Sequence, residues 1–474
     1  MTELLVASNR GPLSFRVHDG QLTAQRGGGG LVSGLASVSA TTDVLWVCAA
    51  LSDTDRQAAS QAPGGYLEKA GYDTGGASVR MLDIPPDTFD RAYNVVANSV
   101  LWFVHHMLYD TPRRPEFDRA FRGDWQAYVE YNTAYADALA ETAAPGAKVL
   151  VQDYHLALVP RLLRERRADL RIAHFTHTPW APPEYFRMLP DDVATELLTG
   201  ILGADHAGFL SPRWASAFVD CCADVLGAAV TSDTVGLADR TTRCGVHALG
   251  ADGEFLAERA NADDVETRMQ AIRAKAGDRQ LIVRVDRTEL SKNILRGLAA
   301  YRELLRERPQ WRGKVVHVAF AYPSRYGLPE YRDYAAAVEE LAAEIQDEFG
   351  TDDWQPLLLQ VDDDFARSLA AYRLADVLLV NPIRDGMNLV AKEGPVLADH
   401  GVTLVLSREA GAYDELGDDA IAVNPYDVSG TAQALHEALS MPADERAKRC
   451  RRLAEAATGL PPAQWFADQV AALD

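Results

Sequence analysis

Residues 381–395, NPIRDGMNLVAKEGP, directly follow the apolar run VLLV at 377–380. An apolar run that closes in a loop with Pro and Gly and then enters a helix-compatible segment predicts a buried parallel strand ending at a ligand crevice. Polar residues crowd this loop: Arg384, Asp385, Asn388, Lys392 and Glu393. Asn388 and Lys392 are four residues apart, so on a helix they share a face. Taken alone, the stretch also fits a solvated loop that caps a strand.

Backbone groups of the same stretch favour an anionic or sugar ligand. Gly386 lets backbone amides approach a ligand closely. The amides at the start of the helix that follows attract phosphate or sugar oxygens.

Composition predicts a soluble protein of two or three domains, because 474 residues are too many for one ordinary core. The chain shows no secretory signal and no apolar run as long as a membrane span, so we expect it to be cytoplasmic. Its five cysteines are scattered without CxxC spacing, which indicates neither a disulfide framework nor a zinc site. The oligomeric state stays open, a homo-oligomer included.

A formal charge of −21 argues against nucleic acid and anionic membranes as general partners. It also makes clusters of arginine informative. An anionic small-molecule substrate would need a few cations to focus positive potential against this acidic background.

Strand and helix patterns alternate along both halves of the chain. Apolar runs that end in polar residues occur at 4–7, 149–151 and 172–176, and the alternation restarts at 281–285 after a pause near residue 250. This predicts an α/β fold with two Rossmann-like domains, each with a parallel sheet. We expect an N-terminal domain at 1–250, a second domain at 251–445 and a helical segment at 446–474.

Four glycines at 27–30 precede a possible helix start. They match neither the GxGxxG fingerprint nor the GxxxxGK[ST] loop, so a dinucleotide or P-loop site is weakly supported. The loop fits a hinge, a sugar-binding lid or a flexible connection.

Arginine and lysine residues mark candidate phosphate sites after predicted strands. Arg287 and Lys292 flank a strand-to-helix loop, where two cations can hold a diphosphate by charge and hydrogen bonding. The absence of a paired-carboxylate cluster nearby favours a site without metal. Arg10 and Arg325 also follow strands and would bind a second phosphate across a cleft. Solvated surface cations are the alternative.

Asp153 and His177 end two predicted strands of the first domain. They would bond sugar hydroxyls or stabilise charge that develops on a sugar ring. A structural role for the histidine is the alternative.

Several motifs in chain order resemble the trehalose-6-phosphate synthases, retaining glycosyltransferases of family 20 with the GT-B fold. They are Ser8-Asn9-Arg10, Gly29-Gly30-Leu31, Tyr93-Asn94, Asn98 to Trp102, Asp153-Tyr154-His155-Leu156, His177 with Pro179, Arg287 with Ser291-Lys292, Pro323-Ser324-Arg325 and Arg384 to Glu393. The resemblance runs from about residue 4 to about 470 and implies two domains that face each other across a cleft, with a C-terminal helix crossing back to the first domain.

The resemblance also implies roles for single residues. The acceptor, glucose 6-phosphate, would lie against Arg10, Tyr93, Trp102, Asp153 and Arg325. The nucleotide-glucose donor would lie against Gly29, Gly30, Asn388, Leu389, Val390, Ala391, Lys392 and Glu393. The catalytic set would be Arg287, Lys292, His177 and Asp385. No cofactor and no metal are implied, and the partners are small-molecule substrates.

One departure from the family bears on the donor. Asp362-Asp363-Asp364 stand where the better-known uridine-nucleotide members carry a histidine-phenylalanine pair. A carboxylate such as Asp363 accepts hydrogen bonds from guanine, so we expect GDP-glucose over UDP-glucose. The Arg-rich, Lys-poor composition, which resembles actinomycete members, agrees with this. The alternative is that these aspartates cap a helix.

Two other functions remain open at this stage. The chain would be a related transferase with another phosphorylated acceptor, such as glycerol phosphate or a pseudo-sugar phosphate, or a catalytically silent sugar-phosphate sensor. Retention of both the acceptor set and the catalytic set favours trehalose 6-phosphate synthesis.

Overall fold

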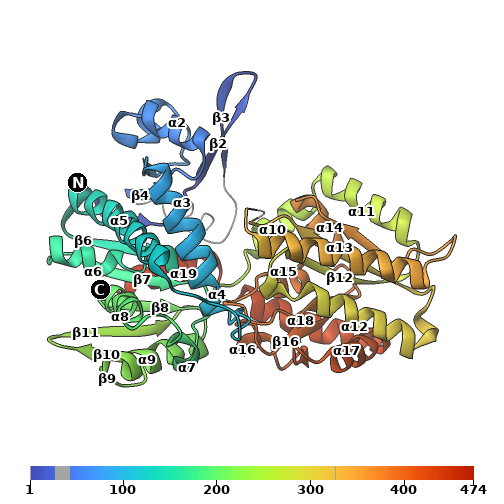
Figure 1. Cartoon of the computed structure of the whole chain (residues 1–474). Coiled ribbons are helices and arrows are strands. Elements are labelled where there is room, and N and C mark those ends of the chain that lie inside the picture. The colour runs from blue at the N-terminus through green and yellow to red at the C-terminus, as the bar shows by residue number, and fades with distance from the viewer. Residues whose placement is uncertain (1, 27–42, 326) are drawn as a thin grey trace. The chain divides into compact units, whose positions relative to one another are not determined.

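The computed structural model describes residues 2–26, 43–325 and 327–474 (Figure 1). The chain divides into two compact units, Met1–Leu249 with Pro462–Asp474, and Gly250–Pro461. The return to the first unit begins at Pro462, later than the expected residue 446. The reason is that α18 (Ala443–Thr458) packs against α15 (Val390–Leu397) and so stays with the second unit.

The first unit is built on one largely parallel sheet. Within the described residues it has nine strands in the order β5-β4-β1-β6-β7-β8-β11-β10-β9, and only β10 runs antiparallel to its neighbours. The strands are β1 (Thr2–Ala7), β4 (Val44–Ala49), β5 (Ser78–Leu82), β6 (Ala143–Gln152), β7 (Arg171–Thr176), β8 (His206–Phe209), β9 (Ala229–Val230), β10 (Thr234–Leu237) and β11 (Arg240–Val246). The order reverses between β1 and β6, so ligands are expected at the carboxyl ends of these two strands.

Helices and one hairpin complete the first unit. A π-helical segment, η3 (Arg91–Leu101), is followed directly by α4 (Trp102–His105). The other elements are the hairpin β2 (Leu13–His18) and β3 (Gln21–Arg26), and the helices α2 (Asp53–Gln61), α3 (Pro86–Asp90), α5 (Arg119–Thr142), α6 (Val159–Arg166), α7 (Pro183–Phe186), α8 (Asp191–Ile201), α9 (Pro212–Leu226) and α19 (Pro462–Ala471). Trp465 and Phe466 anchor α19, because both side chains are fully buried.

The second unit contains a wholly parallel sheet. Its described strands follow the order β14-β13-β12-β15-β16-β17, and the order reverses between β12 and β15. The strands are β12 (Gln280–Arg287), β13 (Val315–Tyr322), β14 (Leu357–Gln360), β15 (Val377–Val380), β16 (Thr403–Ser407) and β17 (Ile421–Val423). The predicted α/β class with a parallel sheet in each half is confirmed.

The helices of the second unit form two groups by their contacts. α12 (Ile294–Glu307) packs against α13 (Pro329–Phe349) and α17 (Val428–Ser440). The other group joins α15 and α18 to α10 (Gly253–Ala260), α11 (Asp263–Ala276) and α14 (Phe365–Leu374). The short helix α16 (Tyr413–Leu416) contacts α18. Strands that alternate with helices in this way are the reason for the parallel pairing.

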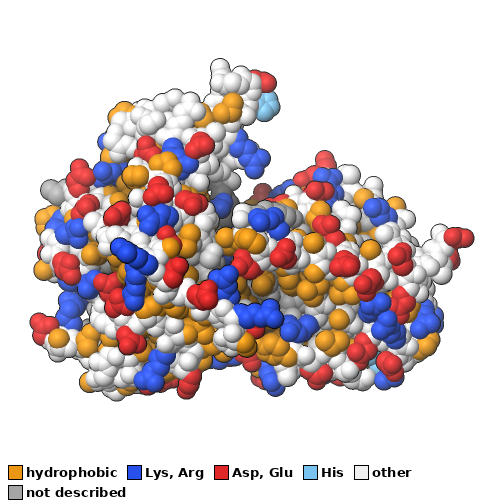
Figure 2. Space-filling model, in the orientation of Figure 1, with side chains coloured by type: hydrophobic (Ala, Val, Ile, Leu, Met, Phe, Trp, Pro, Cys, Tyr) orange, Lys and Arg blue, Asp and Glu red, His pale blue; other side chains and the backbone are white. Residues whose placement is uncertain are grey.

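The surface is charged throughout. Figure 2 shows acidic and basic side chains interspersed over both units. In the part of the chain that the structure describes, no helix has the length and apolar character needed to cross a bilayer.

Candidate active site

A pocket of about 320 Å³ lies in the second unit at the carboxyl ends of its strands. Five predicted site residues line it: Arg287, Lys292, Asp363, Val390 and Glu393. Side chains that the sequence did not point to complete the wall, among them Asp286, Tyr322, Phe365, Ser368 and Tyr372. The pocket therefore occupies the place where open parallel sheets bind ligands.

A buried carboxylate holds the exposed arginine at the end of β12. Glu289 is fully buried, and its Oε1 accepts a hydrogen bond from Ser324 Oγ at 2.9 Å and pairs with Arg287 Nη1 at 3.1 Å. Burial opposes ionisation, but Arg287, Arg325 and Lys292 outweigh it and lower the pKa of Glu289 to about 2. Glu289 is therefore charged, and it fixes Arg287, whose side chain is 56% exposed.

Lys292 joins the two strand ends at which the order reverses. Its Nζ donates to Asp385 Oδ2 at 2.6 Å, and Asn388 Nδ2 donates to the same oxygen at 3.1 Å. Burial disfavours the ammonium, but Asp385, Asp286 and Glu289 outweigh this and raise the pKa of Lys292. A cation that stays charged is thus held at the pocket wall, beside two residues of the 381–395 stretch.

The pocket wall includes the start of α15. Val390 and Glu393 lie there, and Leu389 and Ala391 flank Val390 in the chain. Burial raises the pKa of Glu393 to about 7, although the Tyr372 hydroxyl beside it acts in the opposite direction. Glu393 therefore titrates near neutral pH.

Lys392 points away from this surface. Its side chain is fully buried and its Nζ donates to Glu415 Oε1 at 2.7 Å. The prediction that Asn388 and Lys392 share a helix face was wrong. Asn388 precedes α15, which begins at Val390, and has a left-handed backbone with φ of 77°.

The three aspartates at 362–364 separate into different roles. Asp363 lines the pocket. Asp364 caps α14: its Oδ1 accepts the Arg367 backbone N–H at 3.0 Å, and its Oδ2 accepts from Arg268 Nε at 2.7 Å. The capping alternative therefore holds for Asp364, and Asp363 is the one of the three that lines the pocket.

A buried ion pair lies at the pocket floor. Arg284 is fully buried and donates Nη2 to Asp286 Oδ2 at 2.7 Å and to the Lys292 carbonyl at 3.1 Å. Desolvation raises the pKa of Asp286, and Arg284 and Lys292 act against it. An arginine inside the apolar run at 281–285 was the sequence signal for this pair.

In the first unit, Asp153 follows β6 at the point where the strand order reverses. Its backbone has φ of 74° and ψ of 168°, a region that is nearly restricted to glycine. Its Oδ1 accepts the His177 backbone N–H at 3.1 Å. The two predicted residues are thus in direct contact, and Asp153 is held in a strained conformation.

His177 is oriented through the C-terminal helix. Gln152 Nε2 donates to Gln469 Oε1 at 3.1 Å, and the Gln152 oxygen lies 2.9 Å from His177 Nε2. The Gln152 oxygen therefore accepts a hydrogen bond from the Nε2–H of His177, which leaves Nδ1 as the acceptor of the neutral ring. Burial lowers the pKa of His177, so the ring is neutral. Trp465 of α19 packs beside it, with ring centroids 5.5 Å apart.

The remaining predicted acceptor residues of the first unit lie at or after its elements. Arg10 is exposed after β1. Tyr93 stacks on His155 with centroids 5.5 Å apart, and Trp102 stacks on His106 at 3.8 Å. Aromatic rings on these helices provide flat, amphipathic surfaces suited to a sugar.

Arg325 belongs to the second unit. It follows β13 with φ of 45°, and its Nη1 donates to Tyr331 Oη at 2.7 Å. Gly29 and Gly30 lie outside the described residues. In the described parts of the chain, no group of three or more His, Cys, Asp and Glu side chains is arranged to hold a metal ion.

Comparisons with known proteins identify the family of the chain. The family pattern described as glycosyltransferase family 20 matches residues 2–474. An alpha,alpha-trehalose-phosphate synthase (UDP-forming) 2 from Aspergillus niger is 35% identical over 480 residues, which cover 99% of this chain and 96% of the relative.

Solved structures match over the same length. An E. coli structure of trehalose-6-phosphate bound with UDP-2-fluoro glucose is 28% identical, with a TM-score of 0.86 over 99% of this chain and 98% of that one. A UDP-forming alpha,alpha-trehalose-phosphate synthase from Burkholderia xenovorans, in complex with glucose-6-phosphate, is 27% identical, with a TM-score of 0.85 over 99% of both chains. The match over the whole length, in sequence and in fold, shows that the chain belongs to glycosyltransferase family 20.

Proposed function

We propose that this chain is a retaining glucosyltransferase that moves glucose from a nucleotide-glucose to glucose 6-phosphate and gives α,α-trehalose 6-phosphate. The observation that carries the proposal is the pocket of the second unit, where Arg287, Lys292 and Glu393 converge at the reversal of strand order. Relatives named trehalose-phosphate synthases support the same reaction.

The donor would occupy this pocket. Arg287 and Lys292 supply positive charge for the diphosphate, and Glu393 supplies a carboxylate for the ribose hydroxyls. The backbone N–H groups of residues 389–391 at the start of α15 would donate hydrogen bonds to phosphate oxygens. Asp385 would contact the transferred glucose. Its carboxylate is already held in place, because Lys292 and Asn388 both donate to Oδ2.

The acceptor would lie against the residues that the sequence predicted for it. Arg10 and Arg325 would bind its phosphate, with Tyr93 and Trp102 against the sugar. Asp153 would contact the acceptor sugar and His177 the transferred glucose. Each is already held by a neighbour, Asp153 by the His177 amide and His177 by Gln152. Groups held in place before substrate binds lose little entropy when they engage it.

The reaction requires that the two substrates are held in position and that the charge developing on the leaving diphosphate is stabilised. The bond from C1 of the donor glucose to the diphosphate breaks while the anomeric hydroxyl oxygen of the acceptor bonds to C1 from the same face. The hydroxyl proton passes to the leaving phosphate oxygen. Arg287 and Lys292 stabilise the charge that develops on the diphosphate, which is a large source of rate enhancement in a site arranged beforehand.

Two nucleotides are candidates for the donor. The relatives are named UDP-forming, which favours UDP-glucose and gives no support to the GDP-glucose predicted from the sequence. Asp363, a pocket-lining carboxylate, keeps GDP-glucose as the second candidate. Asp364 does not contribute to this argument, since it caps α14.

The test is a set of initial rates with glucose 6-phosphate and, in parallel, UDP-, GDP- and ADP-glucose, with the sugar product identified by mass and NMR. Trehalose 6-phosphate from any donor supports the transferase, and the ratio of kcat/KM values decides the base. If no donor gives turnover while glucose 6-phosphate still raises Tm, a silent sensor replaces the transferase.

A further inference from the structure

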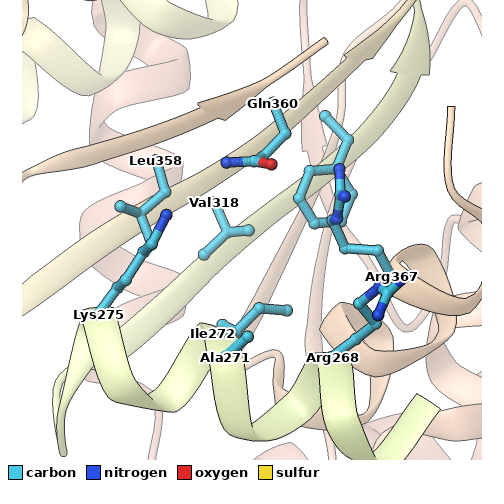
Figure 3. Close-up of a pocket in the computed structure, with 9 residues that line it drawn as sticks. Arg268, Ala271, Ile272, Lys275, Val318, Leu358, Gln360 and Arg367 are labelled. Carbon is cyan, nitrogen blue, oxygen red and sulfur yellow. The ribbon is translucent and has the colours of Figure 1, made fainter. Parts of the chain in front are cut away.

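A second pocket of about 70 Å³ lies beneath α11 (Figure 3). Its floor is formed by three side chains that are 5% exposed or less, Val318 and Phe320 of β13 and Leu358 of β14. Ile272 of α11 closes one wall. We call it the α11 pocket. We call the pocket of about 320 Å³ that is proposed for the donor the donor pocket. None of the residues that line the α11 pocket lines the donor pocket, so the α11 pocket is a separate cavity.

Cations stand at both ends of this apolar floor. Figure 3 shows Lys275 beside Leu358 at one end and Arg268 and Arg367 at the other. Arg268 and Lys275 lie one heptad apart, with Ala271 between them, so they form one stripe on α11. Arg268 and Arg367 share the carboxylate of Asp364, and Lys275 adds a third positive charge, so the rim of the cavity is net positive and attracts an anion that carries an apolar group.

The volume limits the apolar group. A cavity of roughly 150 Å³ lined by aliphatic and aromatic side chains holds a benzene ring. The α11 pocket has less than half that volume, which on the same scale fits a branched group of about three carbons, such as an isopropyl group. The carboxylate of such a ligand would remain at the rim, within reach of the cations.

Asp364 connects this pocket to the donor pocket. On one side its Oδ2 accepts from Arg268 Nε at 2.7 Å and pairs with Arg367 Nη2 at 3.2 Å. On the other side its carbonyl accepts from Tyr322 Oη at 3.1 Å, and Tyr322 lies 2.5 Å from Ser368 Oγ. Tyr322 and Ser368 line the donor pocket, so both cavities share the first turn of α14.

We propose that the α11 pocket binds short branched aliphatic carboxylates and that such a ligand weakens donor binding. The ligand carboxylate competes with Asp364 for Arg268, whose side chain is 39% exposed and thus free to turn. Loss of this pairing loosens the cap of α14 and the donor-pocket wall that it carries. The site stands on its own geometry, whereas its effect on the donor rests on the proposed function.

The first experiment measures binding alone. Saturation-transfer NMR on the full chain uses 3-methylbutanoate as probe and 3-methylbutanamide and valine as controls. The amide lacks the charge, and valine, which is 2-amino-3-methylbutanoate, adds only an ammonium that the positive rim repels. We expect signal from the carboxylate well above that from either control. Equal signals from the carboxylate and the amide, or none from the carboxylate at millimolar concentration, would overturn the site.

A pair of variants on one helix locates the binding. Ala271→Trp fills the α11 pocket, and Ala274→Trp places the same side chain at an exposed position of α11 that does not line it. We expect Ala271→Trp to abolish the carboxylate signal and Ala274→Trp to keep it, with similar Tm values. Binding that survives in Ala271→Trp places the probe elsewhere and refutes the assignment.

The second experiment measures coupling. Saturating 3-methylbutanoate should raise the donor KM by about two- to fivefold, the scale of one partly exposed ion pair, and leave the KM for glucose 6-phosphate unchanged. Arg268→Gln should raise the donor KM by itself and remove the response. A bound probe with an unchanged donor KM refutes the coupling alone, and a chain without turnover refutes the proposed function while the binding result still stands.

Discussion

The carboxylate of Glu289 lies 3.1 Å from the guanidinium of Arg287, and the two residues differ sharply in exposure. Glu289 is fully buried, whereas the Arg287 side chain is 56% exposed. The same carboxylate accepts from Ser324, which precedes Arg325 in the chain. One buried charge therefore orders the proposed donor cation Arg287 and the loop that bears the proposed acceptor cation Arg325.

Replacing Glu289 by glutamine should impair both stability and turnover. The variant leaves Arg287, Arg325 and Lys292 without their buried counter-charge, and we expect a loss of about 2 kcal/mol of unfolding free energy, because partial exposure of Arg287 reduces the penalty of a fully buried pair. kcat should fall about tenfold as Arg287 loses its fixed position. Urea unfolding and initial rates check both. Glu289→Asp keeps the charge and should recover most of the loss; a glutamine variant with normal kcat would contradict this role.

Arg287→Ala should remove turnover and leave the fold intact. The side chain is half exposed, so its loss creates no cavity, but the leaving diphosphate loses a cation. We expect kcat to fall about 10²- to 10³-fold, as for the loss of one electrostatic donor elsewhere. Arg306→Ala is the matched control: Arg306 pairs with Glu348 on the surface at 2.6 Å, away from the pocket lining, and its loss should leave kcat unchanged. Near-normal turnover of Arg287→Ala would refute the donor assignment.

Local sequence pattern was sufficient to place several candidate residues at the ends of strands. An apolar run followed by polar residues places Arg287 after β12, Asp385 after β15 and Asp153 after β6, because parallel strands bring their carboxyl ends to one edge. The reversal of strand order, which selects two of these ends in each unit, becomes visible only once the sheets are formed.

What the sequence missed depends on contacts between distant segments. Gln469 supports His177 through Gln152 from 317 residues further along the chain. Tyr372 and Ser368 enter the donor pocket only through the rotation of α14 about its axis. The misplacement of Lys392 has a local origin: helix spacing was applied across Asn388, whose left-handed backbone lies outside the helix.

Donor affinity should depend on pH through Glu393. Burial raises its pKa to about 7, above its ordinary 4.5. A carboxylate accepts hydrogen bonds from ribose hydroxyls more strongly than a neutral carboxylic acid does. The donor KM should therefore fall about fivefold as pH rises from about 6 to 8. Stability has the opposite sign. Because the folded pKa is raised, the contribution of Glu393 is present at low pH and is lost as pH rises through about 7.

Initial rates across this pH range, with Tm of the free protein measured in parallel, check both effects. Glu393→Gln should give a donor KM that does not change with pH and a flatter profile of Tm. If the glutamine variant keeps the full pH dependence of KM, another group carries it.

The backbone of Asp153 provides a last test, which separates strain from side-chain chemistry. With φ of 74° and ψ of 168°, the residue adopts a conformation that costs a non-glycine residue about 1–3 kcal/mol. Both Asp153→Gly and Asp153→Ala lose the bond to the His177 amide and the proposed contact with the acceptor, so both should lose most turnover. Glycine alone relieves the strain. Asp153→Gly should therefore unfold at a higher urea concentration than Asp153→Ala, by about 0.5–2 kcal/mol in unfolding free energy, because the larger backbone freedom of glycine in the unfolded chain offsets part of the relieved strain. Equal stabilities would show that the backbone relaxes once the carboxylate is gone, and that the His177 bond holds Asp153 in this conformation.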